Sequence, residues 1–266
     1  MTRAHPSRIG PRFAACAAEG RAALVGYLTA FDPDRQGSLD RLLAACEAGL
    51  DVLELGVPFS DPTADGPVIQ AAMTRALAAG ATLHGALELA AALRARVDVP
   101  IVLFGYANPF LRHGPEDMVE RSVAAGIDGL LCVDLPPEHA AALRDPARAA
   151  GLDWIGLCAP TSTDARIQRV LAAATGFVYA VSLTGVTGAR LDVEDPALHA
   201  QLAALRARAS TPVAVGFGVR WPDQVRALAR HADGVIVGSA LVQAGQGGVD
   251  ELTGLVRALR AATVRG

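Results

Sequence analysis

The chain has 266 residues, 52% apolar and 19% charged, so it can bury a large core and is not expected to be disordered. Its formal net charge is -3 and it has no basic block, which argues against a nucleic-acid partner. No apolar run reaches the roughly 18 residues of a membrane-spanning helix, so no membrane association is expected.

The alternation of strand-like and helix-like segments predicts the fold. Strands are predicted over 22–28, 51–57, 101–106, 129–134, 153–158, 177–182, 212–217 and 234–237. Helices are predicted over 38–48 with Ser38 as N-cap, and over 68–79, 83–96, 116–125, 137–149, 163–173, 196–208, 222–230 and 249–262. Eight strand–helix units without a break predict a single α/β domain over 1–266, a (β/α)8 or TIM barrel. A doubly wound open sheet is the alternative, disfavoured because no G-x-G-x-x-G follows the first strand.

The N-terminal segment and the cysteines bear on location. A short Ala/Cys patch that follows Pro and Arg is not typical of a signal peptide, and we expect a helix over 8–20 that caps the barrel. The four cysteines form no C-x-x-C pair, which indicates buried thiols in a reducing cytoplasm; they are Cys16, Cys46, Cys132 and Cys158.

Two absences from the sequence limit the chemistry. All 24 basic residues are Arg, and without Lys the chain cannot form a Schiff base, attach pyridoxal phosphate or build a Walker loop. The six histidines are scattered, and none has metal-ligand spacing with another His or Cys, so we expect no metal site. No nucleophile elbow or Ser/His/Asp set is found either.

Two acids lie in the stretch 51–70, DVLELGVPFSDPTADGPVIQ. Glu54 interrupts an apolar strand, and Asp65 lies in the loop that follows. An unpaired buried carboxylate costs several kcal/mol, so such a group is paired, neutralised or used in chemistry. The alternatives are an ion pair with an Arg for Glu54 and simple turn formation for Asp65. A buried Glu has a raised pKa and can exchange a proton near neutral pH.

Glycine-rich segments follow the predicted strands at the end where barrels place their sites. The segments 216–218 and 237–240 follow the seventh and eighth strands, where backbone N–H groups and a helix N-terminus commonly bind phosphate. The alternative is that these glycines only form tight turns. Residues 182–190 are rich in glycine and predict a mobile lid. Together with the two acids, this pattern predicts acid–base chemistry on a phosphorylated substrate.

Several motifs resemble one known family. They are LELGVPFSDPTADGPVIQ, GYLTAFDPD (26–34), GYANP (105–109), VDLPPE (133–138), APTST (159–163), GVTGAR (185–190), GFGV (216–219) and DGVIVGSA (233–240). In this order, over nearly the whole chain, they are similar to the tryptophan synthase alpha chain family.

The resemblance implies a carbon–carbon lyase of tryptophan biosynthesis. The reaction is the retro-aldol cleavage of indole-3-glycerol phosphate to indole and glyceraldehyde 3-phosphate, in which the indolenine tautomer is the electron sink. By resemblance, Glu54 is the general acid and base, and Asp65 accepts the indole N–H and stabilises its positive charge. The implied substrate contacts are Tyr106, Tyr179, Thr187 and Phe217, and the implied phosphate contacts are Gly188, Gly218, Gly238 and Ser239.

The resemblance also implies a partner. Family members work with a beta chain in an alpha2-beta2 heterotetramer, and the pyridoxal phosphate belongs to that chain, so no cofactor is expected here. Loops 58–67 and 183–192 would be mobile and close when the partner docks near Asn108, Pro109 and Pro136. Two alternatives remain open: a stand-alone lyase that releases free indole, and a barrel that acts mainly as an allosteric or docking subunit.

One position departs from the family pattern. Phe31 stands where the family usually has glycine, which can adopt a positive φ or leave room for a neighbour. The loop after the first strand, and the indole side of the site, could therefore differ in shape.

Overall fold

The computed structural model describes residues 7–182 and 191–265. Its strands are β1 (Ala23–Thr29), β2 (Val52–Gly56), β3 (Ile101–Gly105), β4 (Gly129–Cys132), β5 (Asp153–Trp154), β6 (Gly156–Cys158), β7 (Val178–Val181), β8 (Val213–Gly216) and β9 (Gly234–Val237). Its helices are α1 (Ile9–Ala18), α2 (Arg35–Ala48), α3 (Pro67–Ala78), α4 (Leu83–Arg94), α5 (Ala107–Leu111), α6 (Pro115–Ala124), α7 (Ala141–Ala149), α8 (Asp164–Ala173), α9 (Pro196–Arg208), α10 (Pro222–Ala229), α11 (Ser239–Gly247) and α12 (Val249–Ala262).

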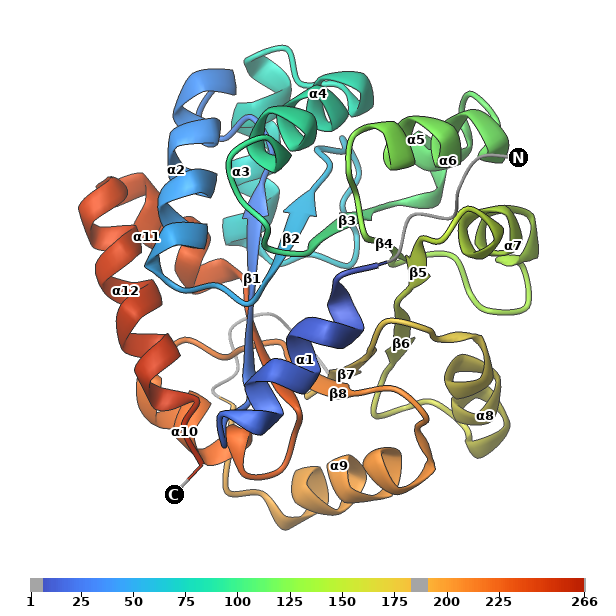
Figure 1. The fold of residues 1–266 in the computed structure, drawn as a ribbon, viewed down its shortest axis with the longest axis vertical. Coiled ribbons are helices and arrows are strands. Elements are labelled where there is room, and N and C mark those ends of the chain that lie inside the picture. Colours follow the sequence, from blue (N-terminus) through green and yellow to red (C-terminus); the bar gives the residue numbers. More distant parts are fainter. Residues whose placement is uncertain (1–6, 183–190, 266) are drawn as a thin grey trace.

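The strands form a barrel ringed by helices (Figure 1). The strand order is β5-β4-β3-β2-β1-β9-β8-β7-β6, and all the paired strands are parallel. The two ends of this order, β5 and β6, are pieces of one predicted strand and are separated only by Ile155. The predicted (β/α)8 barrel is therefore confirmed, with its fifth strand broken in two.

The N-terminal helix α1 lies across one end of the barrel (Figure 1). Ile9 packs against Gly129, where an added Cβ would lie 3.0 Å from the Ile9 Cδ1 atom. Phe13 packs against Gly234, where an added Cβ would lie 2.9 Å from the Phe13 Cε1 atom. Because Gly129 and Gly234 begin their strands, α1 covers the N-terminal end of the barrel. The opposite, C-terminal end carries the polar and glycine-rich loops.

Three aspartates brace the N-terminal end in the same way. Each directly precedes a strand, accepts the N–H of the first or second residue of a neighbouring strand and pairs with arginine. Asp51 accepts from Leu24 N and pairs with Arg21. Asp128 accepts from Ile101 N and pairs with Arg8 and Arg94. Asp233 accepts from Val213 N and pairs with Arg206. Residues at this end of such barrels serve stability.

Two predicted helix starts are wrong. Helix α2 begins at Arg35, because the Asp34 side chain accepts from Gly37 N at 2.9 Å and caps the helix four residues before the predicted N-cap, Ser38. Ser38 lies inside the helix, where its hydroxyl oxygen accepts from Phe31 N at 3.0 Å. Helix α7 begins at Ala141, because the residues after the double proline at 136–137 form a turn. The short helices α5 and α11 were not predicted.

No single helix in 7–182 or 191–265 is long and apolar enough to cross a membrane; α3 and α4 meet that test only jointly, across a 97° bend.

Phe31 has a backbone conformation that glycine adopts more readily than phenylalanine. Its φ is 64°, in the left-handed region, and its buried ring packs on Gly85 at the start of α4, where an added Cβ would lie 2.8 Å from the ring. The ring therefore points toward helix α4, and the missing side chain of Gly85 leaves the space that the ring fills.

Phe31→Gly is expected to destabilise the fold by about 2–4 kcal/mol while changing substrate cleavage less than about twofold. Losing a buried aromatic ring costs roughly 3–5 kcal/mol, of which relief of left-handed strain returns about 1 kcal/mol. Urea unfolding and steady-state rates would check this. A tenfold change in rate would instead place Phe31 at the reaction site.

Candidate active site

Glu54 is a buried acid in a strand of the barrel. It lies on β2, in register with Tyr27 of β1 and Val102 of β3, and is only 1% exposed. Its Oε1 atom has no hydrogen-bond partner in the described part of the chain, and no arginine there pairs with it. The ion-pair alternative is therefore not found among these residues. Burial raises the pKa of Glu54 to about 8.

Asp65 lies in the loop after β2 and is 8% exposed. The Tyr106 hydroxyl donates to its Oδ2 atom at 2.6 Å and accepts from Ala64 N at 3.1 Å. Burial raises the pKa of Asp65 to about 6, and the hydrogen bond from Tyr106 opposes that rise. The Asp65 backbone N–H donates to Pro62 O in a turn at 3.1 Å, but this turn leaves the carboxylate free for another role.

Both acids lie near one tyrosine inside the barrel. The pKa of Tyr179 on β7 is raised by burial and then by the charges of Glu54 and Asp65. Because β7 lies four strands from β2 in the barrel order, groups on these strands can approach each other only through the interior. The pairing of strands in a closed barrel thus brings the predicted residues Glu54, Asp65 and Tyr179 together.

Tyr27 belongs to the same interior and was not predicted as a site residue. It is 2% exposed, and its pKa is raised by burial and by nearby Asp65, Tyr106 and Glu54. Its ring lies over Gly56, where any Cβ would collide with the hydroxyl. The glycine two residues after Glu54, on the same face of the strand, was the signal that could have indicated a large neighbour here.

The hydrogen bond between Tyr106 and Asp65 predicts a pH effect. In Tyr106→Phe the carboxylate loses a donor that favours its charged form, so the pKa of Asp65 is expected to rise above about 6. If ionised Asp65 is required, the acid limb of the pH profile of kcat/KM shifts to higher pH. Tyr179→Phe is the control, because no hydrogen bond joins Tyr179 to Asp65 in the described structure. Equal acid limbs in wild type and Tyr106→Phe would contradict the assignment.

Three of the four predicted phosphate residues lie at two neighbouring strand ends. Phe217 and Gly218, after β8, both have positive φ, 85° and 87°. Gly238, after β9, is the N-cap of α11, and Ser239 is the first residue of that helix. Since β8 and β9 are paired, these segments lie side by side. The N-terminus of α11 supplies unpaired N–H groups and a favourable dipole for an anion. Thr187 and Gly188 lie outside the described residues, as does most of the predicted lid.

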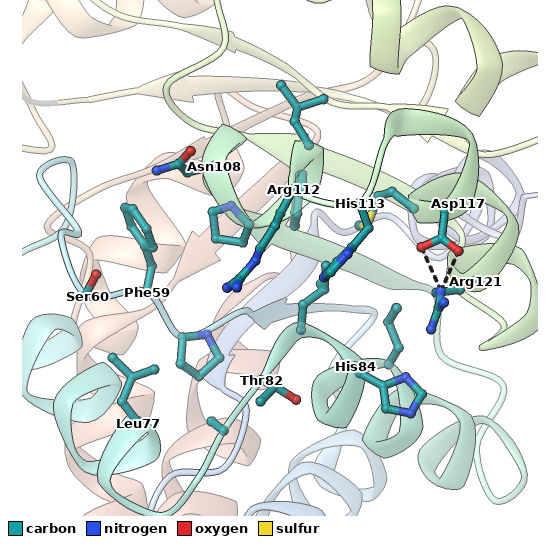
Figure 2. Close-up of a pocket in the computed structure, with 18 residues that line it drawn as sticks. Phe59, Ser60, Leu77, Thr82, His84, Asn108, Arg112, His113, Asp117 and Arg121 are labelled. Atoms are coloured by element: carbon teal, nitrogen blue, oxygen red, sulfur yellow. Dashed lines mark hydrogen bonds and ion pairs between the residues drawn. The ribbon is translucent and has the colours of Figure 1, made fainter.

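A large hollow lies beside the loop that follows β2, and neither Glu54 nor Asp65 lines it. It measures about 980 Å³ and is lined by Pro58–Ser60, the α3–α4 turn, α5 and the first part of α6. Figure 2 shows Phe59, Ser60 and Asn108 at one side of it, with Arg112 extending between α5 and the α3–α4 turn. No group of three His, Cys, Asp or Glu side chains suited to a metal occurs in 7–182 or 191–265.

Comparison with known proteins identifies the family. A family model described as tryptophan synthase alpha chain matches residues 13–263. The chain belongs to the tryptophan synthase alpha chain family. The alpha chain of Gluconacetobacter diazotrophicus is 52% identical over 89% of this chain and 86% of its own length. The alpha chain of Geobacter sulfurreducens is 51% identical, with 89% of each chain covered.

Solved structures agree with this membership. A structure of Mycobacterium tuberculosis tryptophan synthase has a TM-score of 0.92 and 40% identity, covering 98% of this chain and 100% of that one. A Legionella pneumophila alpha subunit has a TM-score of 0.89 and 35% identity, covering 97% of this chain and 99% of that one. Tryptophan synthase alpha chains are lyase subunits that work with a beta chain, and the pyridoxal phosphate belongs to that beta chain.

Proposed function

We propose that this chain cleaves indole-3-glycerol phosphate to indole and glyceraldehyde 3-phosphate, as the alpha subunit of a tryptophan synthase. The observation that carries the proposal is Glu54: a fully buried carboxyl without a hydrogen-bond donor in the described structure, in the same interior as Asp65. An unpaired acid there has no value for stability, since burial opposes its charge. It has value for proton transfer near neutral pH.

The two acids have different proposed roles because their surroundings give them different pKa values. With a pKa of about 8, Glu54 is largely protonated at neutral pH and can give a proton to indole C3. It can then take one from the glycerol hydroxyl as the carbon–carbon bond breaks. Asp65, with a lower pKa and a donor from Tyr106, holds negative charge, and it accepts the indole N–H and stabilises the cation. Tyr179, Phe217 and the unlocated Thr187 line the substrate.

The phosphate is assigned to the paired ends of β8 and β9. Gly218, Gly238 and Ser239 offer backbone and hydroxyl donors at the N-terminus of α11. Gly188 completes the proposed set from outside the described residues. This placement puts the glycerol chain between the phosphate and Glu54.

We assign the large hollow to the beta-chain face, in an alpha2-beta2 complex that acts in the cytoplasm. Asn108 and Pro109 line the hollow at the start of α5, and Asp134 holds that start by accepting from Ala107 N at 2.7 Å. Tyr106 directly precedes α5 and donates to Asp65, so a single residue links the proposed contact segment to the acid. All four cysteines are buried and free, in keeping with a reducing compartment.

Indole release with and without a beta chain separates this proposal from its alternatives. A slow reaction that rises tenfold or more with the partner supports a coupled subunit. Fast release by the chain alone supports the stand-alone lyase. Activation of the beta chain without any cleavage of indole-3-glycerol phosphate supports the docking subunit.

A further inference from the structure

Ser182 touches the backbone of the proposed phosphate site. It follows β7, and its N–H donates to Gly216 O at 2.9 Å. Its hydroxyl oxygen lies 2.7 Å from Gly216 O and 2.6 Å from Phe217 O, so its single proton is shared between two carbonyls. Ser182 is therefore bonded to the segment that leads into Gly218, across the pairing of β7 with β8.

This hydrogen bond fixes the orientation of the peptide group between Phe217 and Gly218. In a trans peptide the C=O and the following N–H point in opposite directions. Since Phe217 O faces Ser182, the Gly218 N–H points away from it. No acceptor for this N–H occurs among residues 7–182 and 191–265. An N–H donor left free beside the N-terminus of α11 suits an anion.

The conformation that exposes this donor is an unfavourable one for phenylalanine. Phe217 has a φ of 85°, which only glycine adopts readily, so the chain needs a contact that holds it there. Strained residues of this kind cluster at binding and catalytic sites. The hydroxyl of Ser182 is the side-chain group that bonds the Phe217 carbonyl.

We infer that Ser182 is a positioning residue for the phosphate: it holds the strained Phe217–Gly218 peptide so that the Gly218 N–H can donate to the anion. The inference rests on the proposed function, because it concerns the phosphate of the same substrate. Ser182 itself acts through the peptide and need not touch the substrate.

Ser182→Ala tests this in the full chain. Binding of inorganic phosphate is expected to weaken about five- to tenfold, and KM for indole-3-glycerol phosphate to rise by the same factor, with kcat within about threefold of wild type. Ser182→Thr keeps the hydroxyl and should restore binding. Ser122→Ala is the matched control, because it also removes a hydroxyl bonded to a backbone carbonyl, Met118 O at 2.7 Å in α6. It should leave KM unchanged.

A second variant separates positioning from general loss of stability. Glycine adopts a positive φ without strain, so in a Phe217→Gly background the effect of Ser182→Ala on phosphate binding should shrink to about twofold or less. Phosphate binding by Ser182→Ala equal to wild type, or an undiminished effect in that background, would overturn the inference while leaving the proposed function standing. A wild-type chain that neither binds phosphate nor cleaves the substrate would overturn both.

Discussion

Glu54→Gln is expected to lower the rate of indole release by about 10²–10⁴-fold, because the amide has the shape of the acid but cannot exchange a proton. KM should change little, since the side chain keeps its volume. Release of indole under saturating substrate, with the beta chain present, measures the effect. Glu47→Gln, an exposed change on α2, is the control and should retain full activity. A Glu54→Gln protein with more than a tenth of wild-type activity would remove Glu54 from the mechanism.

The same variant should be more stable than wild type, increasingly so as pH rises. The folded-state pKa of Glu54, about 8, lies above its ordinary value of 4.5, so the folded protein holds a proton that the unfolded chain has released. The contribution of Glu54 to stability is therefore present below pH 4.5 and is lost as pH rises to about 8. Glutamine has no such loss. The difference in free energy of unfolding between the two proteins should grow from pH 5 to pH 8.

Asp51→Ala is expected to destabilise the fold by about 3–5 kcal/mol, because it removes one partner of a buried ion pair. Asp51 and Arg21 are 3% and 4% exposed in their side chains, with two bonds of 2.6 and 2.8 Å between them. Removing the carboxylate deprives Leu24 N of its acceptor and leaves a buried guanidinium whose one remaining close acid, among the residues that the structure describes, is Glu19. Urea unfolding followed by circular dichroism would show the fall in midpoint.

Two further variants separate the buried charge from simple truncation. Asp98 also pairs with an arginine, Arg8, but its side chain is 87% exposed, so Asp98→Ala should cost less than about 1 kcal/mol. Arg21→Met combined with Asp51→Ala should cost less than Asp51→Ala alone, because no buried charge is left unpaired. If the Asp51→Ala and Asp98→Ala midpoints coincide, the bracing role of Asp51 is wrong.

The barrel could be predicted because its signals are local. Apolar runs and helical segments recur at the spacing of strand–helix units, and each strand was predicted within a few residues of its position. A helix start is harder to predict where two residues could serve as N-cap. Asp34 and Ser38 are both good N-cap residues, but the Ser38 hydroxyl is engaged in a tertiary hydrogen bond from Phe31 N, so Asp34 is the cap. The helix α11 is short and glycine-rich, so its sequence resembled a loop.

The site was only partly predictable for a similar reason. Glu54 and Asp65 were noticeable because acids are out of place in and beside a buried strand. Tyr27 was not, because a tyrosine in an apolar strand is ordinary, and its place beside Glu54 depends on the register between β1 and β2. The hydrogen bond of Ser182 depends likewise on the pairing of β7 with β8, which no single segment encodes.

The most direct test of the central claim is product analysis with the purified chain, indole-3-glycerol phosphate and a beta chain, without serine. Wild type is expected to form indole and glyceraldehyde 3-phosphate in equal amounts, and Glu54→Gln is expected to form neither above background while remaining folded. Equal product formation by the two proteins, or no cleavage by wild type, would contradict the assignment of Glu54 as the acid and base of this lyase.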